Sequence, residues 1–211
     1  MYDRDMEDVS AFVLAGGRSS RMGTDKAFVE LEGRTLLDRA IELAAAGASD
    51  VRIVGSAEKL ANFGRVVEDE FPNRGPLGGI HAALQASHAN LNLVLAVDLP
   101  FVEVRFLKYL LAQACASGAV ITIPRAAGGW QPLCAVYRKQ FAGIAETALR
   151  QGKNKIDPLF ALVDVRVVEE DELRSCGFGC DMFRNLNTPE ELSEAGKIHA
   201  VLGARIPGSN N

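Results

Sequence analysis

Short apolar runs alternate with longer amphipathic segments along most of the chain, and this alternation limits the possible folds more than any other feature of the sequence. The runs are Val9–Leu14, Val51–Val54, Arg65–Val67, Leu93–Val97, Ala119–Ile123 and Val163–Val168. Uninterrupted apolar runs are typical of parallel strands that are buried on both faces. Strands that alternate with helices form right-handed βαβ units. The pattern therefore predicts an α/β fold with three layers, in which helices cover both faces of a mostly parallel sheet.

The segments between these runs have the spacing of amphipathic helices. In residues 36–46 the apolar side chains recur near one face, and Gly47 follows as a predicted C-cap. Similar segments are Gly78–Ser87, Glu103–Ala116 and Gln140–Arg150. Near the C-terminus, the sequence NTPEEL at residues 187–192 contains a capping box and predicts the start of another helix.

Length and charge narrow the class of protein. Residues 1–211 are predicted to form one domain, because a chain of this length needs only one core, and the polar residues 196–211 are predicted to fray. A net charge of −4 argues against a nucleic-acid partner. The sequence shows no signal peptide and no apolar stretch near the roughly 20 residues that cross a bilayer. We therefore expect a cytoplasmic protein that binds no membrane.

The cysteines and histidines show no catalytic or metal-binding pattern. The cysteines lack a CxxC pair and an accompanying histidine cluster, so we expect reduced thiols. They are Cys115, Cys134, Cys176 and Cys180. No serine or carboxylate spacing around His81, His88 or His199 is typical of a triad, and we expect these histidines to be incidental.

The loop that follows the first apolar run has the composition of an anion-binding site. It reads LAGGRSSRMGTDKA over residues 14–27. Gly16 and Gly17 allow the backbone to turn tightly and to bring N–H groups toward an anion. Arg18, Arg21 and Lys26 add the positive charge that suits a triphosphate. The loop matches neither the P-loop nor the dinucleotide fingerprint, so from composition alone a basic surface loop without a ligand remains the alternative.

Two carboxylates follow other predicted strands, at the edge where open α/β sheets bind ligands. Asp98 ends an apolar run, where it is predicted either to hold Mg²⁺ or to cap the next helix. Asp69 either forms a turn or contacts a ligand. The helix predicted to open at Gly78 or Gly79 presents backbone N–H groups to a base or an anion.

The loop at residues 14–26 resembles the motif LAGGxSxRMGxDK of the molybdenum cofactor guanylyltransferases, which belong to the wider group of GlmU-like and cytidylyltransferase-like nucleotidyltransferases. The specified positions are Leu14, Ala15, Gly16, Gly17, Ser19, Arg21, Met22, Gly23, Asp25 and Lys26. Further segments that resemble this family are EDEFPNRGPLGGIHAAL, AVDLPFV, WQPLCAVYRK and NLNTPEEL. The resemblance runs from about residue 9 to residue 192.

This resemblance implies a Rossmann-like nucleotidyltransferase fold, that of the nucleotide-diphospho-sugar transferases. Its N-terminal half would bind nucleotide and its C-terminal half the acceptor. The implied reaction transfers GMP from GTP to the phosphate of molybdopterin and releases pyrophosphate. The implied roles are catalysis for Arg21, Lys26 and Asp98, a Mg²⁺ ligand in Asp98, nucleotide binding for Leu14, Ala15, Gly16, Gly17, Arg21, Lys26, Asp69, Gly78, Gly79 and Asp98, and acceptor binding for Asn185, Asn187 and Trp130.

Some alternatives stay open at the level of sequence. Trp130 is equally consistent with hydrophobic packing, and the two asparagines with anchoring a turn. Gly55 and Ser56 stand where the family often has an asparagine, so the contact assigned to that asparagine is unsupported. Rival functions are a related cytidylyltransferase or sugar-phosphate nucleotidyltransferase, and a non-catalytic nucleotide-binding regulator. We expect a monomer that contacts molybdenum-insertion or molybdoenzyme-maturation proteins only transiently.

Overall fold

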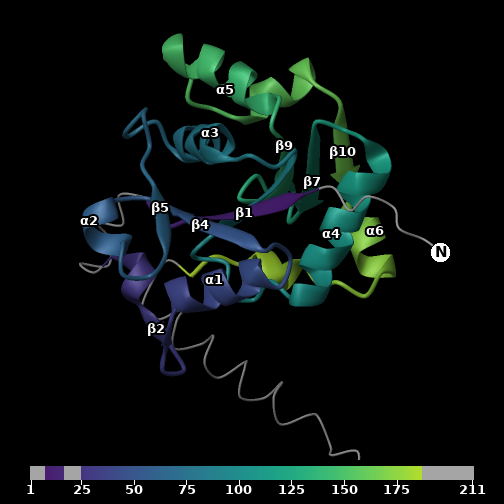
Figure 1. Cartoon of the computed structure of the whole chain (residues 1–211). Coiled ribbons are helices and arrows are strands. Elements are labelled where there is room, and N and C mark those ends of the chain that lie inside the picture. Colours follow the sequence, from purple (N-terminus) through teal and green to yellow (C-terminus); the bar gives the residue numbers. More distant parts are fainter. Residues whose placement is uncertain (1–7, 17–24, 187–211) are drawn as a thin grey trace, which may run out of the picture.

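A twisted central sheet organises the computed structural model, which describes residues 8–16 and 25–186 (Figure 1). Within these residues, the strands of the sheet are β1 (Val9–Leu14), β4 (Asp50–Val54), β5 (Arg65–Val67), β6 (Leu91–Ala96), β7 (Ile121–Ala126), β8 (Gly129–Trp130), β9 (Cys134–Arg138) and β10 (Val165–Val168). Their order is β10-β7-β9-β6-β1-β4-β5, with β8 paired to β7. The neighbours β6, β1, β4 and β5 run parallel, whereas β9 runs antiparallel between β6 and β7.

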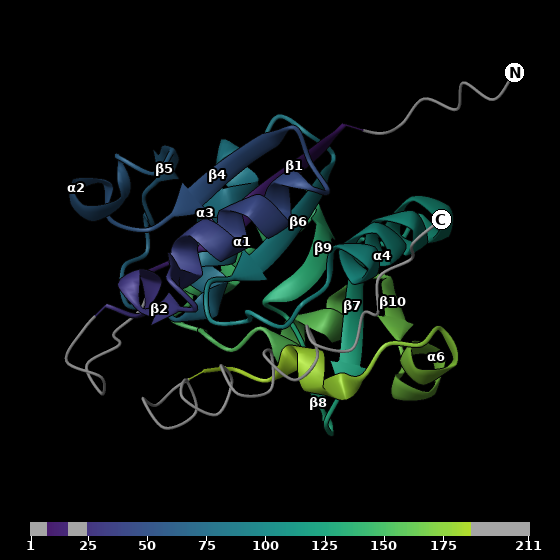
Figure 2. The same ribbon diagram turned by 90° about the horizontal axis from the view of Figure 1, so that it is seen from below.

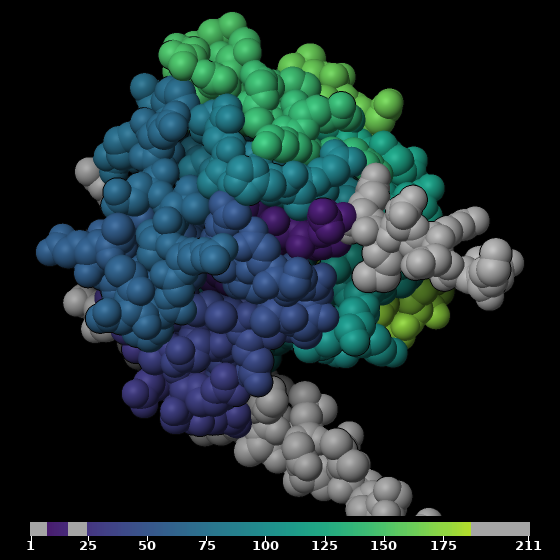
Figure 3. All heavy atoms as spheres, in the orientation of Figure 1, coloured from purple at the N-terminus to yellow at the C-terminus, as the bar shows by residue number. Residues whose placement is uncertain are grey.

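Helices cover both faces of the sheet and complete the three layers (Figure 1). One face carries α3 (Pro76–Ala86) and α5 (Phe141–Arg150); the other carries α1 (Leu36–Ala45), α4 (Val104–Ser117) and α6 (Glu170–Ser175). Figure 3 shows the start of β1, in purple, between these two helical layers. Each layer buries its own hydrophobic core against the sheet. The predicted α/β/α fold with a mostly parallel sheet is confirmed.

Shorter elements lie around this framework. The helix α2 (Ala57–Leu60) follows β4 at one edge, and β2 (Glu30–Leu31) pairs with β3 (Arg34–Thr35) in a small hairpin before α1. Residues 8–16 and 25–186 also contain the 3₁₀ helices η1 (Lys26–Phe28), η2 (Asp157–Leu162) and η3 (Cys180–Phe183). In the part of the chain that is described, no helix has both the length and the apolar character needed to cross a membrane.

Local sequence explains where the main helices begin. Thr35 caps α1, because its hydroxyl accepts a hydrogen bond from the N–H of Asp38 (3.0 Å). Pro76 occupies the first turn of α3, where its missing N–H costs nothing. Gly75, just before it, has a φ of +68°, a conformation that favours glycine.

The structure corrects the predicted end of the first helix, whereas the predictions for the C-terminal residues fall outside the described part of the chain. Gly47 is not the C-cap of α1: that position is Ala46, which has ordinary right-handed helical geometry. Gly47 instead lies close to α4, since a Cβ at this residue would stand 3.1 Å from Leu111 Cδ1. The helix predicted from residue 188 and the frayed end predicted for residues 196–211 lie outside the described residues.

Candidate active site

The carboxyl ends of β1, β4 and β6 open into a cleft with a volume of about 940 Å³. The three strand ends are level, because Leu14 lies opposite Val54 on one side and opposite Ala96 on the other. The lining residues are Leu14, Ala15, Gly16, Asp25, Lys26, Val54, Gly55, Ser56, Glu68, Asp69, Pro72, Asn73, Gly75, Pro76, Gly79, Ala96, Val97, Asp98 and Leu133. Residues predicted from four separate strand-end loops therefore meet in one place.

An ion pair lies at the centre of this cleft. The ammonium of Lys26 is 3.2 Å from Oδ2 of Asp98, and each side chain is 20% exposed. Lys26 comes from η1 and Asp98 from the turn after β6, so the fold joins residues that are 72 positions apart. Asp98 does not cap the next helix, because α4 begins only at Val104 with Glu103 as its N-cap residue. The capping alternative is therefore wrong.

Two glycines let the loops after β1 and β4 approach each other closely. A Cβ on Gly16 would lie 3.4 Å from the Cα of Gly55, and a Cβ on Gly55 would lie 2.6 Å from Leu60 Cδ1. The side chain of Leu60, on α2, thus fills the space that an asparagine at position 55 would need. The N–H of Gly16 donates to the carbonyl of Val54 (3.1 Å). This bond ties the loop after β1 to the end of β4, and the predicted contact of Gly16 with a phosphate stays a prediction.

Asp69 lies at the opposite wall of the cleft and is packed against α3. Its Oδ1 accepts a hydrogen bond from the N–H of Phe71 (2.8 Å), which closes the turn after β5. Burial raises the pKa of Asp69 above its ordinary value, and the Phe71 hydrogen bond acts in the opposite direction. A Cβ on Gly78 would stand 2.5 Å from Asp69 Oδ2, so α3 admits this carboxylate only because residue 78 is glycine. Asp69 therefore both forms the turn and faces the cleft.

Gly78→Ala is expected to displace Asp69 and to weaken nucleotide binding. The added methyl overlaps the carboxylate and the Phe71 carbonyl, and such overpacking typically costs about 1–3 kcal/mol of unfolding free energy. Gly143→Ala is the matched control, because Gly143 is an exposed residue of α5 whose added Cβ meets nothing within 4 Å. It is expected to stabilise the protein by about 0.5–1 kcal/mol. Urea unfolding and GTP titration measure both effects, and equal affinities in the two variants would contradict this role of Gly78.

Gly79 and several residues without a predicted role complete the wall. A Cβ on Gly79 would lie 3.1 Å from Leu14 Cδ2, so Gly79 allows α3 to pack against the end of β1. Asn73 has a φ of +64°, which an asparagine tolerates better than most residues. Leu133 reaches the cleft because its carbonyl accepts a hydrogen bond from the N–H of Ala96 (2.8 Å). Their positions follow from turn geometry and from strand pairing, which sequence spacing does not reveal.

Two of the residues predicted for the acceptor side, Trp130 and Asn185, are described by the structure and do not line this cleft. Trp130 packs edge-on against Phe160, with 5.2 Å between the ring centroids, and the guanidinium of Arg125 lies 5.2 Å from the centre of its ring. This is the hydrophobic packing that the sequence allowed for Trp130, and its predicted contact with the acceptor stays a prediction. Asn185 is exposed. The predicted residues Gly17, Arg18, Arg21 and Asn187 lie outside the described residues.

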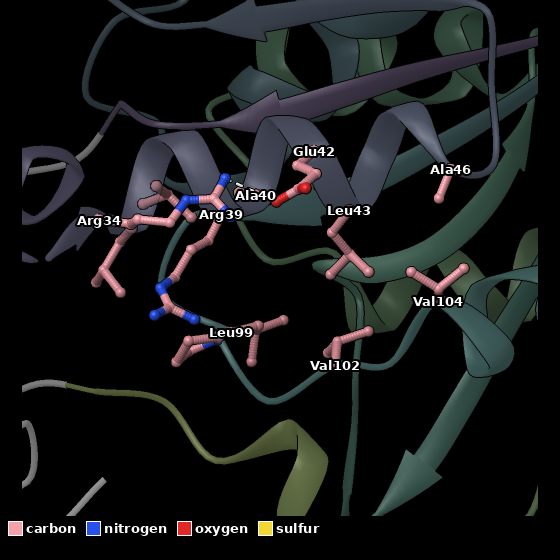
Figure 4. Close-up of a pocket in the computed structure, with 12 residues that line it drawn as sticks. Arg34, Arg39, Ala40, Glu42, Leu43, Ala46, Leu99, Val102 and Val104 are labelled. Atoms are coloured by element: carbon pink, nitrogen blue, oxygen red, sulfur yellow. Dashed lines mark ion pairs between the residues drawn. The ribbon is translucent and has the colours of Figure 1, made fainter. Parts of the chain in front are cut away.

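A second, smaller cavity of about 350 Å³ lies between α1 and the segment that follows Asp98. Figure 2 shows α1 and α4 on this face of the sheet, and in Figure 4 Leu43 of α1 points toward Val102. Arg34 pairs with Glu42 across 2.7 Å. Among the described residues, none to which the sequence analysis assigned a catalytic, metal-binding, nucleotide-binding or acceptor-binding role lines this cavity, so we place the candidate site in the larger cleft.

Comparison with known proteins shows the family of the chain. The family model for a MobA-like NTP transferase domain matches residues 11–168. A "Probable molybdenum cofactor guanylyltransferase" from Pelotomaculum thermopropionicum is 36% identical, covering 90% of this chain and 93% of the relative. One from Opitutus terrae is 38% identical, covering 89% and 95%. The crystal structure of molybdopterin-guanine dinucleotide biosynthesis protein A from Archaeoglobus fulgidus superposes with a TM-score of 0.80 at 30% identity, covering 91% and 99%.

Proposed function

The chain belongs to the MobA-like NTP transferase family, and on this premise we propose that it transfers GMP from GTP to the phosphate of molybdopterin, with release of pyrophosphate. The product is molybdopterin guanine dinucleotide. The relatives named as guanylyltransferases and the similar structure from Archaeoglobus fulgidus support the choice of substrates. The observation that carries the proposal is the Lys26–Asp98 pair in a cleft at the carboxyl ends of parallel strands.

The chemistry asks mainly for charge neutralisation and positioning. The attacking group is a phosphate oxygen of the acceptor, which is already anionic, so no strong general base is required. Lys26 carries a positive charge on a flexible stem that can follow the phosphates, and we assign it to the triphosphate and the leaving pyrophosphate. Arg21, from the same motif, is proposed for the same role. Ala15 and Gly16 line the cleft, and we assign their backbone to the floor beneath the phosphates.

We also propose a requirement for Mg²⁺, held by Asp98. The residues present fit this ion, since Asp98 offers a carboxylate inside the cleft and magnesium binds few protein carboxylates together with phosphate oxygens and water. When bound, Mg²⁺ would neutralise negative charge on the transferred phosphate. Asp25, Glu68 and Asp69 also line the cleft, but their partners are Lys59 and the N–H groups of Ala57 and Phe71. The partner of Asp98 is Lys26, the side chain that we assign to the phosphates. Asp98 is therefore our choice for the ligand.

Incubation of the purified protein with GTP, Mg²⁺ and molybdopterin tests the function. We expect the guanine dinucleotide and one pyrophosphate per product. The same assay with CTP, UTP and ATP distinguishes the related nucleotidyltransferases, and pyrophosphate release that is fastest with CTP would favour a cytidylyltransferase. A protein that binds GTP but yields no product with any of the four nucleotides and molybdopterin would support the non-catalytic regulator instead.

For the setting of this reaction we propose a cytoplasmic monomer. The described residues include all four cysteines and contain no disulfide, which suits a reducing compartment. The net charge of −4 makes nucleic acid an unsuitable partner. Contacts with molybdenum-insertion or molybdoenzyme-maturation proteins are proposed to be transient, because the substrate and product must pass between proteins.

A further inference from the structure

The position of Lys26 depends on a very short helix. The 3₁₀ helix η1 has only three residues, and short 3₁₀ segments of this kind are weak by themselves. Asp25 is its N-cap, and the N–H of Ala27 donates to Asp25 Oδ1 across a long 3.4 Å. Ala27 is fully buried and fixes one side of the helix. Contacts with the rest of the fold must therefore set the direction of Lys26.

Two of these contacts come from the segment of α2. The ammonium of Lys59 lies 3.0 Å from Oδ2 of Asp25, the residue directly before Lys26. Two residues beyond Lys26, the ring of Phe28 packs against Phe63, with 5.6 Å between the centroids. Both ends of η1 are thus held against the same segment, residues 59–63. Phe63 is one of the exposed large apolar side chains among the described residues, and its contact with Phe28 gives this exposed ring a structural role.

The segment of α2 is itself fixed to the wall of the cleft. The N–H of Ala57 donates to Glu68 Oε1 (3.0 Å), and Glu68 lines the cleft. Leu60 is 3% exposed and sits in the space left by the missing side chain of Gly55. Because both ends of α2 are fixed in this way, the contacts of Lys59 with Asp25 and of Phe63 with Phe28 can hold η1 in one position.

We infer that Lys59 and Phe63 are positioning residues, which hold η1 so that Lys26 reaches Asp98 and the phosphates of the substrate. This inference rests on the role that the proposed function gives to Lys26. Lys59 acts through Asp25 and does not touch the substrate. Its effect on catalysis should therefore be smaller than that of Lys26 and should vanish when Lys26 is absent.

A double-mutant cycle tests this role. Lys59→Met is expected to lower kcat/KM for GTP by about threefold to fivefold, the range of a partly exposed ion pair, and Lys59→Arg to restore it to within twofold. Phe63→Ala is expected to give a loss of similar size. In a Lys26→Met background, Lys59→Met should have no further effect, because the two residues act as one unit. Lys108→Met, at an exposed site on α4, is the control and should match the wild type.

The affinity for GTP with Mg²⁺ is measured in the same cycle, because it needs no acceptor and no turnover. Coupling between positions 59 and 26 in this affinity supports the positioning role even if the wild type transfers no guanylyl group, a result that would sink only the proposed function. Equal losses from Lys59→Met in both backgrounds would mean that Lys59 contacts the nucleotide directly. That result, or an unchanged affinity in both Lys59→Met and Phe63→Ala, would overturn the inference.

Discussion

Asp98→Asn is expected to lower the rate of guanylyl transfer by about two to three orders of magnitude, since groups that stabilise transition-state charge typically contribute about 3–4 kcal/mol. The amide keeps the shape of the side chain but loses the charge that we assign to the metal. The free energy of unfolding should change by no more than about 1 kcal/mol, because the lost ion pair with Lys26 is partly open to solvent. Turnover under saturating GTP and Mg²⁺, together with urea unfolding, measures both quantities.

Asp171→Asn provides the matched control for this substitution. Asp171 lies on α6 with a side chain that is 95% exposed, and it pairs only at the surface with Arg174. Its variant should retain wild-type turnover. Binding of Mn²⁺ as a spectroscopic probe in the presence of GTP gives a second readout, and it should be lost in Asp98→Asn. Full activity of Asp98→Asn with Mg²⁺ as the only metal would refute the metal assignment.

Lys26→Met is expected to produce a loss of similar size, about two to three orders of magnitude in kcat/KM for GTP. Methionine keeps most of the length of the stem and removes the charge that we assign to the triphosphate. The affinity for GTP should fall, whereas at saturating GTP the Asp98 carboxylate should still bind Mn²⁺ together with the phosphates. The two variants are thus expected to differ in the affinity that they lose. Asp98→Asn should lose affinity for the metal ion, and Lys26→Met should lose affinity for the nucleotide.

Titrations with GTP and with Mn²⁺ distinguish these two outcomes. Lys108→Met again serves as the control for removing a lysine charge, since Lys108 is exposed on α4 at the far end of the sheet from α2 (Figure 1). If Lys26→Met bound GTP as tightly as the wild type and turned it over at the same rate, Lys26 would have no role in phosphate binding. The pairing with Asp98 would then be only structural.

The apolar runs predicted most of the fold because buried parallel strands leave a direct trace in sequence. The strand β6 shows this well: all its residues from Leu91 to Ala96 are buried, and the run ends at the cleft. The direction of β9 left no such trace. The predicted apolar runs did not include Cys134–Arg138, and its direction could not be predicted either, because a strand buried between two neighbours is apolar whether it runs parallel or antiparallel.

The candidate site was predictable where chemistry follows a strand end, and not where it depends on close packing. Lys26 and Asp98 were expected to meet because β1 and β6 end at one edge. The engagement of the Gly16 N–H with Val54 depends on how closely two loops approach, which spacing cannot give. The packing of Trp130 against Phe160 joins residues that are distant in sequence, so only the fold reveals it.

A crystal structure of the protein with GTP and Mg²⁺ tests the central claim most directly. The account predicts the triphosphate in the large cleft, with a phosphate oxygen within hydrogen-bonding distance of Lys26 Nζ and the metal ion on the Asp98 carboxylate. A nucleotide that binds elsewhere, for instance in the smaller cavity between α1 and Val102, while the large cleft stays empty, would contradict it.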